Sequence, residues 1–434
     1  MSKNDLIRDN LRPGSAILSQ AVPCRPTLGI SLLIMVQCLS SLATGQTTDK
    51  GQDLGQDFQP YPATGLTAND VAQGWIALFD GETLYGWKPQ QDTHTDWQVN
   101  EGTIQASRGD ASLLRTTSQF DDFELRLEFK CPDSTNSGVF LRTSPQPKNP
   151  AGDCYELNIA DGNNPFPTGS LVARQKVEPG QPVVEPGWNQ MHVMARSNRI
   201  TASINGVQVM DYVDKRPLGK GYIGLQFNSG PIAFRKIHLK PIGLEPLIDP
   251  DLGKWNTDQL LASRSTVQPG DPPVMNLRGG KGQLETRRSY ADFVFQLECK
   301  TLAPGLNSGL FFRCIPGELM NGYESQIQNQ YKDQRRDQPV DCGTGGIFRR
   351  TTARQIVSDD LAWFSKTIVA SGPHVSVWVN GYQVTDWSDQ RAPDPNPRKG
   401  RRLAAGTLIL QGHDPTTDID FRNIRVREIS ERRP

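Results

Sequence analysis

The stretch from Asn136 to Asp161 reads NSGVFLRTSPQPKNPAGDCYELNIAD and contains two short β-strand patterns joined by a loop rich in proline and glycine. A second version, NSGLFFRCIPGELMNGYESQIQN, runs from Asn307 to Asn329. In each version an arginine ends the first pattern and a Tyr-Glu pair opens the second. Side chains alternate between the two faces of a strand, so one face is expected to be apolar and the other polar. The repetition indicates that the polar face does more than contact solvent.

The same alternation predicts which side chains accompany the glutamate. Gly138, Phe140 and Arg142 are expected to share one face of the first strand, while Glu156 is separated from the apolar Tyr155 and Leu157. When one sheet of a sandwich curves, the outward side chains of neighbouring strands line its concave face. Those side chains are predicted to be Arg142, Glu156, Asn158 and Gln226, all of them residue types that bind sugars.

The repetition extends over most of the chain. FDDFELRLEFK from Phe120 recurs as YADFVFQLECK from Tyr290, and Asn-Gly hairpin signals and a final FRKIHLKPI-like strand follow in the same order in both copies. Such ordered repetition predicts a tandem duplication with about 180 residues in each copy. The copies are expected at 67–242 and 252–430, with a proline-rich seam at 241–253. The opening LFDGETLYGW has no evident counterpart in the second copy.

Composition favours two β-rich domains. The chain has 434 residues, more than one domain usually holds, and its 40 glycines and 32 prolines are typical of many short elements and turns. Asn-Gly hairpins and the scarcity of helical periodicity predict an all-β fold of two antiparallel sandwiches. The 47 basic and 47 acidic residues cancel, so neither nucleic acid nor an anionic membrane is indicated as a partner.

The first 45 residues have the pattern of a secretory signal. A leader with basic residues precedes an apolar run from Leu28 to Ala43, which is short of the roughly 20 residues that span a membrane. Cleavage near Gly45, a flexible linker at 46–66 and a secreted or periplasmic product without a membrane contact are therefore expected; an uncleaved anchor is the alternative. Five cysteines would then remain, either as buried thiols or with Cys131–Cys154 and Cys314–Cys342 bridges.

Ten short segments, taken in order, resemble the 3-keto-disaccharide hydrolase domain family. They include ALFDGETLYGW, NSGVFLR, YELNIAD, INGVQV and GYIGLQF, and the likeness covers both copies. The resemblance implies a concanavalin A-like jelly roll. It also implies cleavage of glycosides whose 3-hydroxyl is oxidised to a ketone. A ketone at C3 acidifies the C2 hydrogen, so a base and an oxyanion stabiliser suffice for elimination of the C1 oxygen, after which water adds.

The resemblance assigns candidate roles to residues of both copies. The catalytic candidates are Glu156 as base or acid, Arg142 as oxyanion stabiliser, and Asp161 if a bulge brings it to the same face. The substrate-binding candidates are Asn158, Gln226, Asn228, Arg313, Glu324, Gln326, Gln411 and His413. An ordinary retaining pair of carboxylates is incomplete in the first copy and missing in the second. The first copy, with its full opening and Asp161, is expected to be the catalyst.

Several alternatives stay open at the level of sequence. A lectin-like protein with two silent carbohydrate-binding modules has the same fold, because fold does not decide function. The five histidines form no zinc motif, and no cofactor is implied, although a divalent ion held by oxygen ligands is not excluded. The basic run at 398–402 is interpreted as a solvated loop. The oligomeric state is not indicated.

Overall fold

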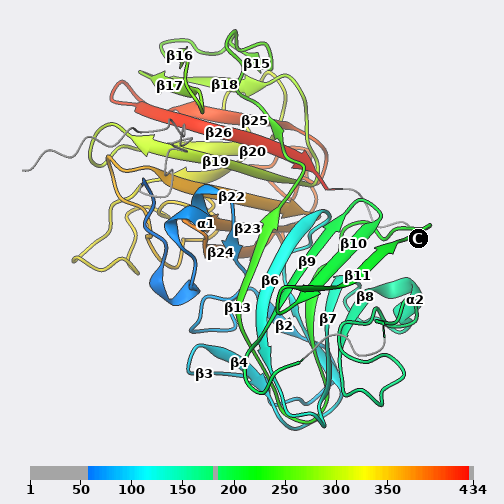
Figure 1. Cartoon of the computed structure of the whole chain (residues 1–434). Helices are drawn as coiled ribbons and strands as arrows, with labels where there is room; N and C mark the ends of the chain where they lie inside the picture. The colour runs from blue at the N-terminus through cyan, green and yellow to red at the C-terminus, as the bar shows by residue number, and fades with distance from the viewer. Residues whose placement is uncertain (1–56, 179–183, 430–434) are drawn as a thin grey trace, which may run out of the picture. The chain divides into compact units, whose positions relative to one another are not determined.

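The strand patterns of both repeats form antiparallel β-strands in the computed structural model, which describes residues 57–178 and 184–429. Strands β1 to β13 build one two-sheet sandwich, and β14 to β26 build a second (Figure 1). The all-β fold class predicted from the sequence is confirmed. The predicted leader, 1–45, and the first part of the predicted linker lie outside the described residues.

The larger sheet of the first sandwich has eight strands. In spatial order they are β11 (Val207–Val213), β10 (Arg199–Ile204), β9 (Asn189–Arg196), β6 (Phe123–Lys130), β13 (Ile232–Pro241), β4 (Thr103–Ala106) and β3 (Gln98–Asn100), with β1 (Ile76–Ala77) paired to β13. Strand β6 shows how the alternating sequence sets this sheet. Phe123, Leu125 and Leu127 are buried in the core, whereas the charged residues between them are partly exposed.

The smaller sheet covers the other side of the core and carries the central stretch. Its five strands, in spatial order, are β2 (Trp87–Pro89), β5 (Ser112–Thr116), β12 (Tyr222–Ser229), β7 (Asn136–Thr143) and β8 (Tyr155–Ile159). Tyr155 and Leu157 face the core, as their alternation with Glu156 predicts. The helical segments with bounds within the described ranges lie outside the sheets; they are η2 (Pro62–Thr64), α1 (Ala68–Ala72) and α2 (Pro150–Asp153).

The second sandwich repeats this topology strand for strand. Its larger sheet contains β24 (Tyr382–Ser388), β23 (His374–Val379), β22 (Phe364–Ser371), β19 (Phe293–Thr301), β26 (Asp418–Glu428), β17 (Val274–Arg278) and β16 (Arg264–Gln268), with β14 (Glu245–Pro246) paired to β26. Its smaller sheet contains β15 (Trp255–Asn256), β18 (Gly282–Thr286), β25 (Thr407–Gly412), β20 (Ser308–Cys314) and β21 (Tyr323–Ile327). Each strand occupies the place of the strand thirteen positions earlier.

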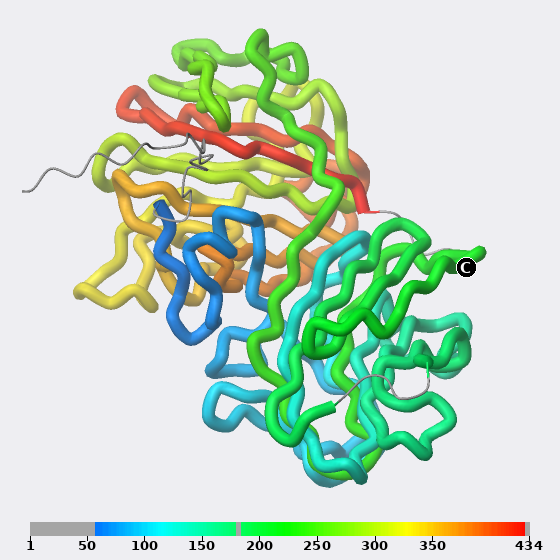
Figure 2. The backbone as a smooth tube through the Cα atoms, in the orientation of Figure 1, coloured from blue at the N-terminus to red at the C-terminus, as the bar shows by residue number. Residues whose placement is uncertain are grey.

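This correspondence corrects the expectation that the second copy lacks an opening. In the first copy the indole Nε1 of Trp87 donates to the carbonyl oxygen of Leu78 at 2.6 Å. In the second, Nε1 of Trp255 donates to the carbonyl oxygen of Leu247 at 2.9 Å. The segment around Leu247 is therefore the diverged counterpart of LFDGETLYGW. Figure 2 shows the chain passing directly from β13 into this segment.

The two sandwiches belong to one compact unit and share polar contacts. The backbone N–H of Ala77 donates to Gly381 at 2.8 Å, and the indole of Trp378 donates to Ala77 at 2.9 Å. Ser118 and Ser376 are joined by their hydroxyls at 2.8 Å. In the second copy these contacts come from the β23–β24 hairpin, which corresponds to β10–β11 of the first copy. This hairpin therefore packs against the first copy.

The cysteines decide between the two alternatives left by the sequence. Cys131, Cys299, Cys314 and Cys342 are free thiols, so neither the Cys131–Cys154 nor the Cys314–Cys342 bridge forms. Burial raises the pKa of Cys299 and of Cys342 to about 12, which keeps both thiols protonated. Within the described part of the chain, no helix has the length and apolar character needed to cross a bilayer.

Candidate functional site

Glu156 lies on the face of β8 that points away from the core. It stands opposite Phe140 of β7, while its neighbours Tyr155 and Leu157 are buried in the core. Only 7% of Glu156 is exposed, and this burial raises the pKa of its carboxyl to about 7, although a hydrogen bond from Gln226 acts in the opposite direction. At neutral pH the carboxyl is thus divided between its acid and base forms, which suits proton transfer.

The glycine of each NSG motif leaves space for this carboxyl. A Cβ atom on Gly138 would lie 3.4 Å from Cγ of Glu156 and 3.5 Å from Oε1 of Gln226. On Gly309 it would lie only 2.6 Å from Oε1 of Glu324, closer than real Cβ contacts come. A side chain at either position would push against the glutamate. The sequence displays both glycines as part of the repeat, but their role depends on this cross-strand contact.

Glu324 takes the same place in the second copy and opens onto a cavity. It stands opposite Phe311 of β20, and burial raises the pKa of its carboxyl to about 7, against the opposing charges of Lys366 and Arg398. The cavity has a volume of about 270 Å³ and is walled in part by Phe311, Tyr323 and Phe348. Glu324 is more exposed than Glu156, so it is the better placed of the two to meet a ligand.

Three arginines line the cavity beside Glu324: Arg349, Arg350 and Arg398. Arg350 donates to the carbonyl oxygen of Arg398 at 3.0 Å, and Arg398 donates to that of Met320. None of the three forms an ion pair with a carboxylate among the described residues. Their charges are therefore available to an anionic group in the cavity. Arg398 lies in an exposed loop, as expected for 398–402, and it also lines this cavity.

The corresponding segment of the first copy carries fewer unpaired cations. The backbone N–H groups of Val172 and Phe348 donate to the carbonyls of Glu156 and Glu324 respectively, which aligns the two segments. Arg349 and Arg350 then correspond to Ala173 and Arg174, and Arg174 is paired with Asp214. Glu324 therefore has arginines without carboxylate partners beside it, whereas the corresponding arginine near Glu156 is paired.

A buried lysine lies beneath Glu324 in the second sandwich. Lys366 of β22 donates through Nζ to the carbonyl oxygens of Ser325 at 2.8 Å and Gln326 at 2.7 Å. Complete burial lowers its pKa to about 8. The first copy has Met191 at the same place in the strand pairing. No pattern within FSKTIVAS marks Lys366 as a residue that contacts the backbone of β21.

Arg142 and Arg313 do not share the face of the glutamates, which corrects the sequence prediction for both. Arg142 has a φ of 46°, and the pairing of β7 with β12 shifts register there. Arg313 has a φ of 50°, with the same shift against β25. A bulge reverses the alternation of side chains, so each guanidinium turns inward. Arg142 donates to Asp122 at 2.9 Å, and Arg313 donates to Asp292 at 2.9 Å.

The other candidate residues of the first copy do not all lie beside Glu156. Asp161 follows the end of β8, is exposed, and accepts a hydrogen bond from the backbone of Asn163 at 2.7 Å. It is therefore not part of the Glu156 face. Asn158 is on that face, but its amide donates to the carbonyl oxygen of Phe166 and fixes the following loop. Asn228 is exposed near the end of β12. Gln226 alone joins Glu156 directly.

The second-copy candidates are held by a loop that covers part of the sheet. The amide of Gln411 contacts the sulfur of Met320 at 3.3 Å, and Met320 packs on Phe311. Gln326 donates to Asn307 at 3.0 Å. The side-chain carbonyl oxygens of Gln326 and Gln411 are buried without a partner. His413 instead pairs with Asp414 at 2.7 Å, at the end of the strand.

No cluster of three or more metal-ligating side chains occurs among residues 57–178 and 184–429.

Replacing Gly309 by alanine is expected to displace the Glu324 carboxylate and to lower turnover of a substrate bound there by at least about tenfold, since a misplaced base loses its alignment. The measurement is the rate per folded molecule. Gly138→Ala meets its nearest atom at 3.3 Å and should cost less. Gly162→Ala, with no atom within 4 Å, is the matched control. Equal rates for Gly309→Ala and Gly162→Ala would contradict the role of Gly309.

Glu156→Gln is expected to flatten the dependence of stability on pH. Because the folded-state pKa is raised from 4.5 to about 7, the folded protein binds more protons than the unfolded chain between these values. The free energy of unfolding therefore falls as pH rises from 4.5 through 7, by up to about 3 kcal/mol for this group. Urea unfolding at pH 5 and pH 8 measures the fall. An identical fall in the variant would show that Glu156 is not the source.

The family match agrees with the duplicated fold. The model of the 3-keto-alpha-glucoside-1,2-lyase-like domain matches residues 74–240 and again 243–427. A 3-keto-disaccharide hydrolase from Bacteroides thetaiotaomicron is 24% identical, over 39% of this chain and 79% of that protein. A crystal structure of a candidate glycosyl hydrolase from Parabacteroides distasonis is 21% identical with a TM-score of 0.37, covering 41% of this chain and 98% of that one.

A carbohydrate-binding module, CBM66 from Bacillus subtilis, is 14% identical with a TM-score of 0.28, covering 36% of this chain and 95% of that one. The family match spans nearly all of the described residues, in two consecutive copies that coincide with the two sandwiches. This chain is therefore a carbohydrate-active protein that belongs to the 3-keto-alpha-glucoside-1,2-lyase-like domain family.

Proposed function

We propose that this protein cleaves the glycosidic bond of 3-keto-glycosides by base-assisted elimination followed by addition of water. The observation that carries the proposal is the Glu324 carboxyl, whose pKa burial raises to about 7, in a cavity lined by arginines without carboxylate partners among the described residues. Membership of the family supplies the substrate class.

The residues of the second copy fit the first step of this reaction. Glu324 in its base form takes the C2 proton, which the C3 ketone has made acidic. The C2–H electrons first form an enolate with its charge on the C3 oxygen. As the C3 carbonyl re-forms, they make the C1–C2 double bond, the C1–O bond breaks, and the leaving oxygen takes up a proton. Water then adds across the C1–C2 double bond to give the free 3-keto-sugar. Each proton removed is returned, so the net reaction is hydrolysis.

The arginines fit the charge that develops during this step. Removal of the C2 proton places negative charge on the C3 oxygen, and fixed cations stabilise such a charge more strongly in a partly dehydrated cavity than in water. Arg349 and Arg398 both interact electrostatically with Glu324, so they lie within range of a group that reacts with it.

Aglycone release from a 3-keto-glucoside, compared with the parent glucoside, tests the proposal. The purified protein is expected to act on the keto compound alone, because only the ketone acidifies the C2 proton. Cleavage of both compounds at similar rates would indicate an ordinary glycosidase. Binding of both without release would favour the lectin-like alternative and overturn the proposal.

We also propose that the protein acts after export, from the signal pattern in the first 45 residues. Sequencing the N-terminus of protein recovered from the periplasm or the medium tests this. An intact leader on protein from the cytoplasm would contradict it.

A further inference from the structure

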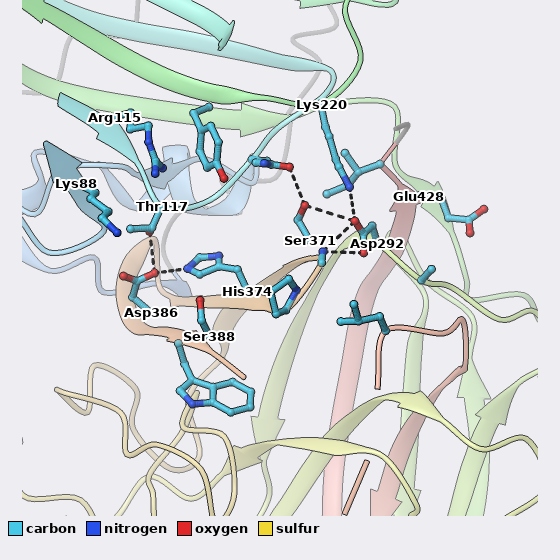
Figure 3. Close-up of a pocket in the computed structure, with 18 residues that line it drawn as sticks. Lys88, Arg115, Thr117, Lys220, Asp292, Ser371, His374, Asp386, Ser388 and Glu428 are labelled. Atoms are coloured by element: carbon cyan, nitrogen blue, oxygen red, sulfur yellow. Dashed lines mark hydrogen bonds and ion pairs between the residues drawn. The ribbon is translucent and has the colours of Figure 1, made fainter. Parts of the chain in front are cut away.

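A cavity lies between the two sandwiches and is separate from both glutamates. Its volume is about 960 Å³, and both copies line it (Figure 3). Lys88, Arg115 and Tyr222 come from the smaller sheet of the first copy. Residues of the β23–β24 hairpin, among them His374 and Trp387, form the facing wall. Neither copy could form this cavity alone.

The first-copy wall carries two cations on one row of the sheet. Lys88 stands opposite Arg115, and Arg115 stands opposite Gly224. The Arg115 guanidinium lies 4.2 Å from the centroid of the Tyr222 ring, which holds it against an aromatic face. Neither Lys88 nor Arg115 forms an ion pair with a carboxylate in the described part of the chain. Figure 3 shows both side chains directed toward the cavity.

The acidic residues of the cavity, in contrast, are engaged by other groups. Asp386 accepts hydrogen bonds from Thr117 at 2.7 Å and is joined to Nε2 of His374 at 2.6 Å. Asp292 is paired with Lys220 and with Arg313. Glu428 is paired with Arg288 at 2.5 Å. Lys220, Arg313 and Arg288 thus compensate Asp292 and Glu428, while Lys88 and Arg115 keep their charges for a ligand.

The facing wall adds groups that suit a sugar. Trp387 is half-buried, and together with Tyr222 it offers aromatic surface on opposite sides of the cavity. The hydroxyl of Ser388 and the amide of Gln119 are also in the lining. Nδ1 of His374 is buried without a hydrogen-bond partner, so the imidazole has one nitrogen still to satisfy. Aromatic faces with a few convergent polar groups are typical of ligand sites.

This cavity is distinct from the site of Glu156, although both occupy one face of the sheet. The row continues from Gly224 to Phe140 and from Phe140 to Glu156, so Arg115 is three strands from Glu156. At about 4.8 Å per strand the separation is roughly 14 Å. Phe140 lies between Arg115 and Glu156 in this row and is buried, so its side chain separates the two sites.

We propose that the cavity between the sandwiches is a second carbohydrate site, which binds an acidic saccharide through Lys88 and Arg115. The anionic group, a carboxylate or a sulfate, contacts the two cations, and the sugar ring lies between the aromatic walls. The site does not depend on the elimination chemistry of Glu324, because it uses none of the same residues.

Titration calorimetry of the whole protein with three probes tests the proposal: an oligogalacturonate, a sulfated dextran oligosaccharide and a neutral maltooligosaccharide. The wild-type protein is expected to bind at least one acidic probe and to bind the neutral one at least about tenfold more weakly. The combined Lys88→Ala and Arg115→Ala variant should lose at least about tenfold in affinity for that acidic probe, because charge-assisted hydrogen bonds are removed. Which acidic probe binds distinguishes a carboxylate site from a sulfate site.

The control removes the same charge elsewhere. Lys148 and Arg264 are exposed and outside the cavity, so Lys148→Ala with Arg264→Ala lowers the net charge equally. The affinity of this control variant for the acidic probe should match the wild-type value. An equal loss in both double variants would show non-specific attraction and overturn the proposal, as would wild-type protein that binds neither acidic probe. Melting temperatures of all variants exclude unfolding as the cause.

Discussion

Glu324→Gln is expected to lower the turnover of a 3-keto-glucoside by about 10²–10⁴-fold, the usual contribution of a positioned base. Glutamine keeps the size of the side chain and much of its hydrogen bonding, so substrate binding should change little. Because the pKa of Glu324 is raised to about 7, the wild-type rate should rise with pH through that value as the carboxyl loses its proton. In the variant this rise should disappear. Aglycone release measured from pH 5 to pH 9 gives both results.

The comparison with Glu156→Gln separates the two copies. Glu156 is only 7% exposed and has no arginine among the groups that shift its pKa, so its replacement should reduce turnover much less. A large loss for Glu156→Gln with normal turnover for Glu324→Gln would restore the order expected from the sequence. Similar losses in both would show that the sandwiches share the reaction. A double variant with wild-type turnover would remove both glutamates from the mechanism.

Arg142→Met is expected to lower the free energy of unfolding of the first sandwich by about 3–5 kcal/mol, the usual result of breaking a buried ion pair. The Arg142 guanidinium is 1% exposed and donates to Asp122, to the carbonyl oxygen of Asp121 at 2.6 Å and to that of Leu218 at 2.9 Å. Methionine fills similar space but leaves these acceptors without the donor. Denaturant unfolding measures the loss.

Turnover distinguishes this structural role from the catalytic role predicted from the sequence. The rate per folded Arg142→Met molecule should stay close to the wild-type value, because the guanidinium points away from Glu156. Arg313→Met is the matched variant in the second copy and should destabilise in the same way, because a second cation stays beside the carboxylate in each copy, Arg427 beside Asp122 and Lys220 beside Asp292. If Arg142→Met had normal stability but lost turnover, Arg142 would have the catalytic role predicted from the sequence.

Local patterns were sufficient for much of the fold. The alternation in FELRLEFK and YELNI is a property of neighbouring residues, and a strand with one buried face obeys it, so the core face of β6 and β8 could be predicted. The repeated order of motifs likewise predicted two similar sandwiches. Glu156 and Glu324 follow from the same alternation, since each is flanked by core residues.

The alternation misled where the backbone departs from a regular strand. At Arg142 and Arg313 a residue with positive φ reverses the facing of the side chain, and nothing in NSGVFLR or NSGLFFR marks that reversal. A bulge is set by the pairing of β7 with β12, that is, by residues about 80 positions away. The counterpart of the opening was missed for a related reason. Trp255 and Leu247 form the same hydrogen bond as in the first copy, but the sequence around them no longer resembles LFDGETLYGW.

The sequence by itself determined the duplication, the strands, the buried faces and the two glutamates, because these depend on contacts that each strand makes through its own alternation. Only the tertiary structure decided what surrounds those glutamates. Arg398 reaches the Glu324 cavity from a loop more than 70 residues away, and Lys88 meets the β23–β24 hairpin only because the two copies pack together. Charges brought together by packing leave no periodic trace in the chain, so their combined field appears only once the fold is known.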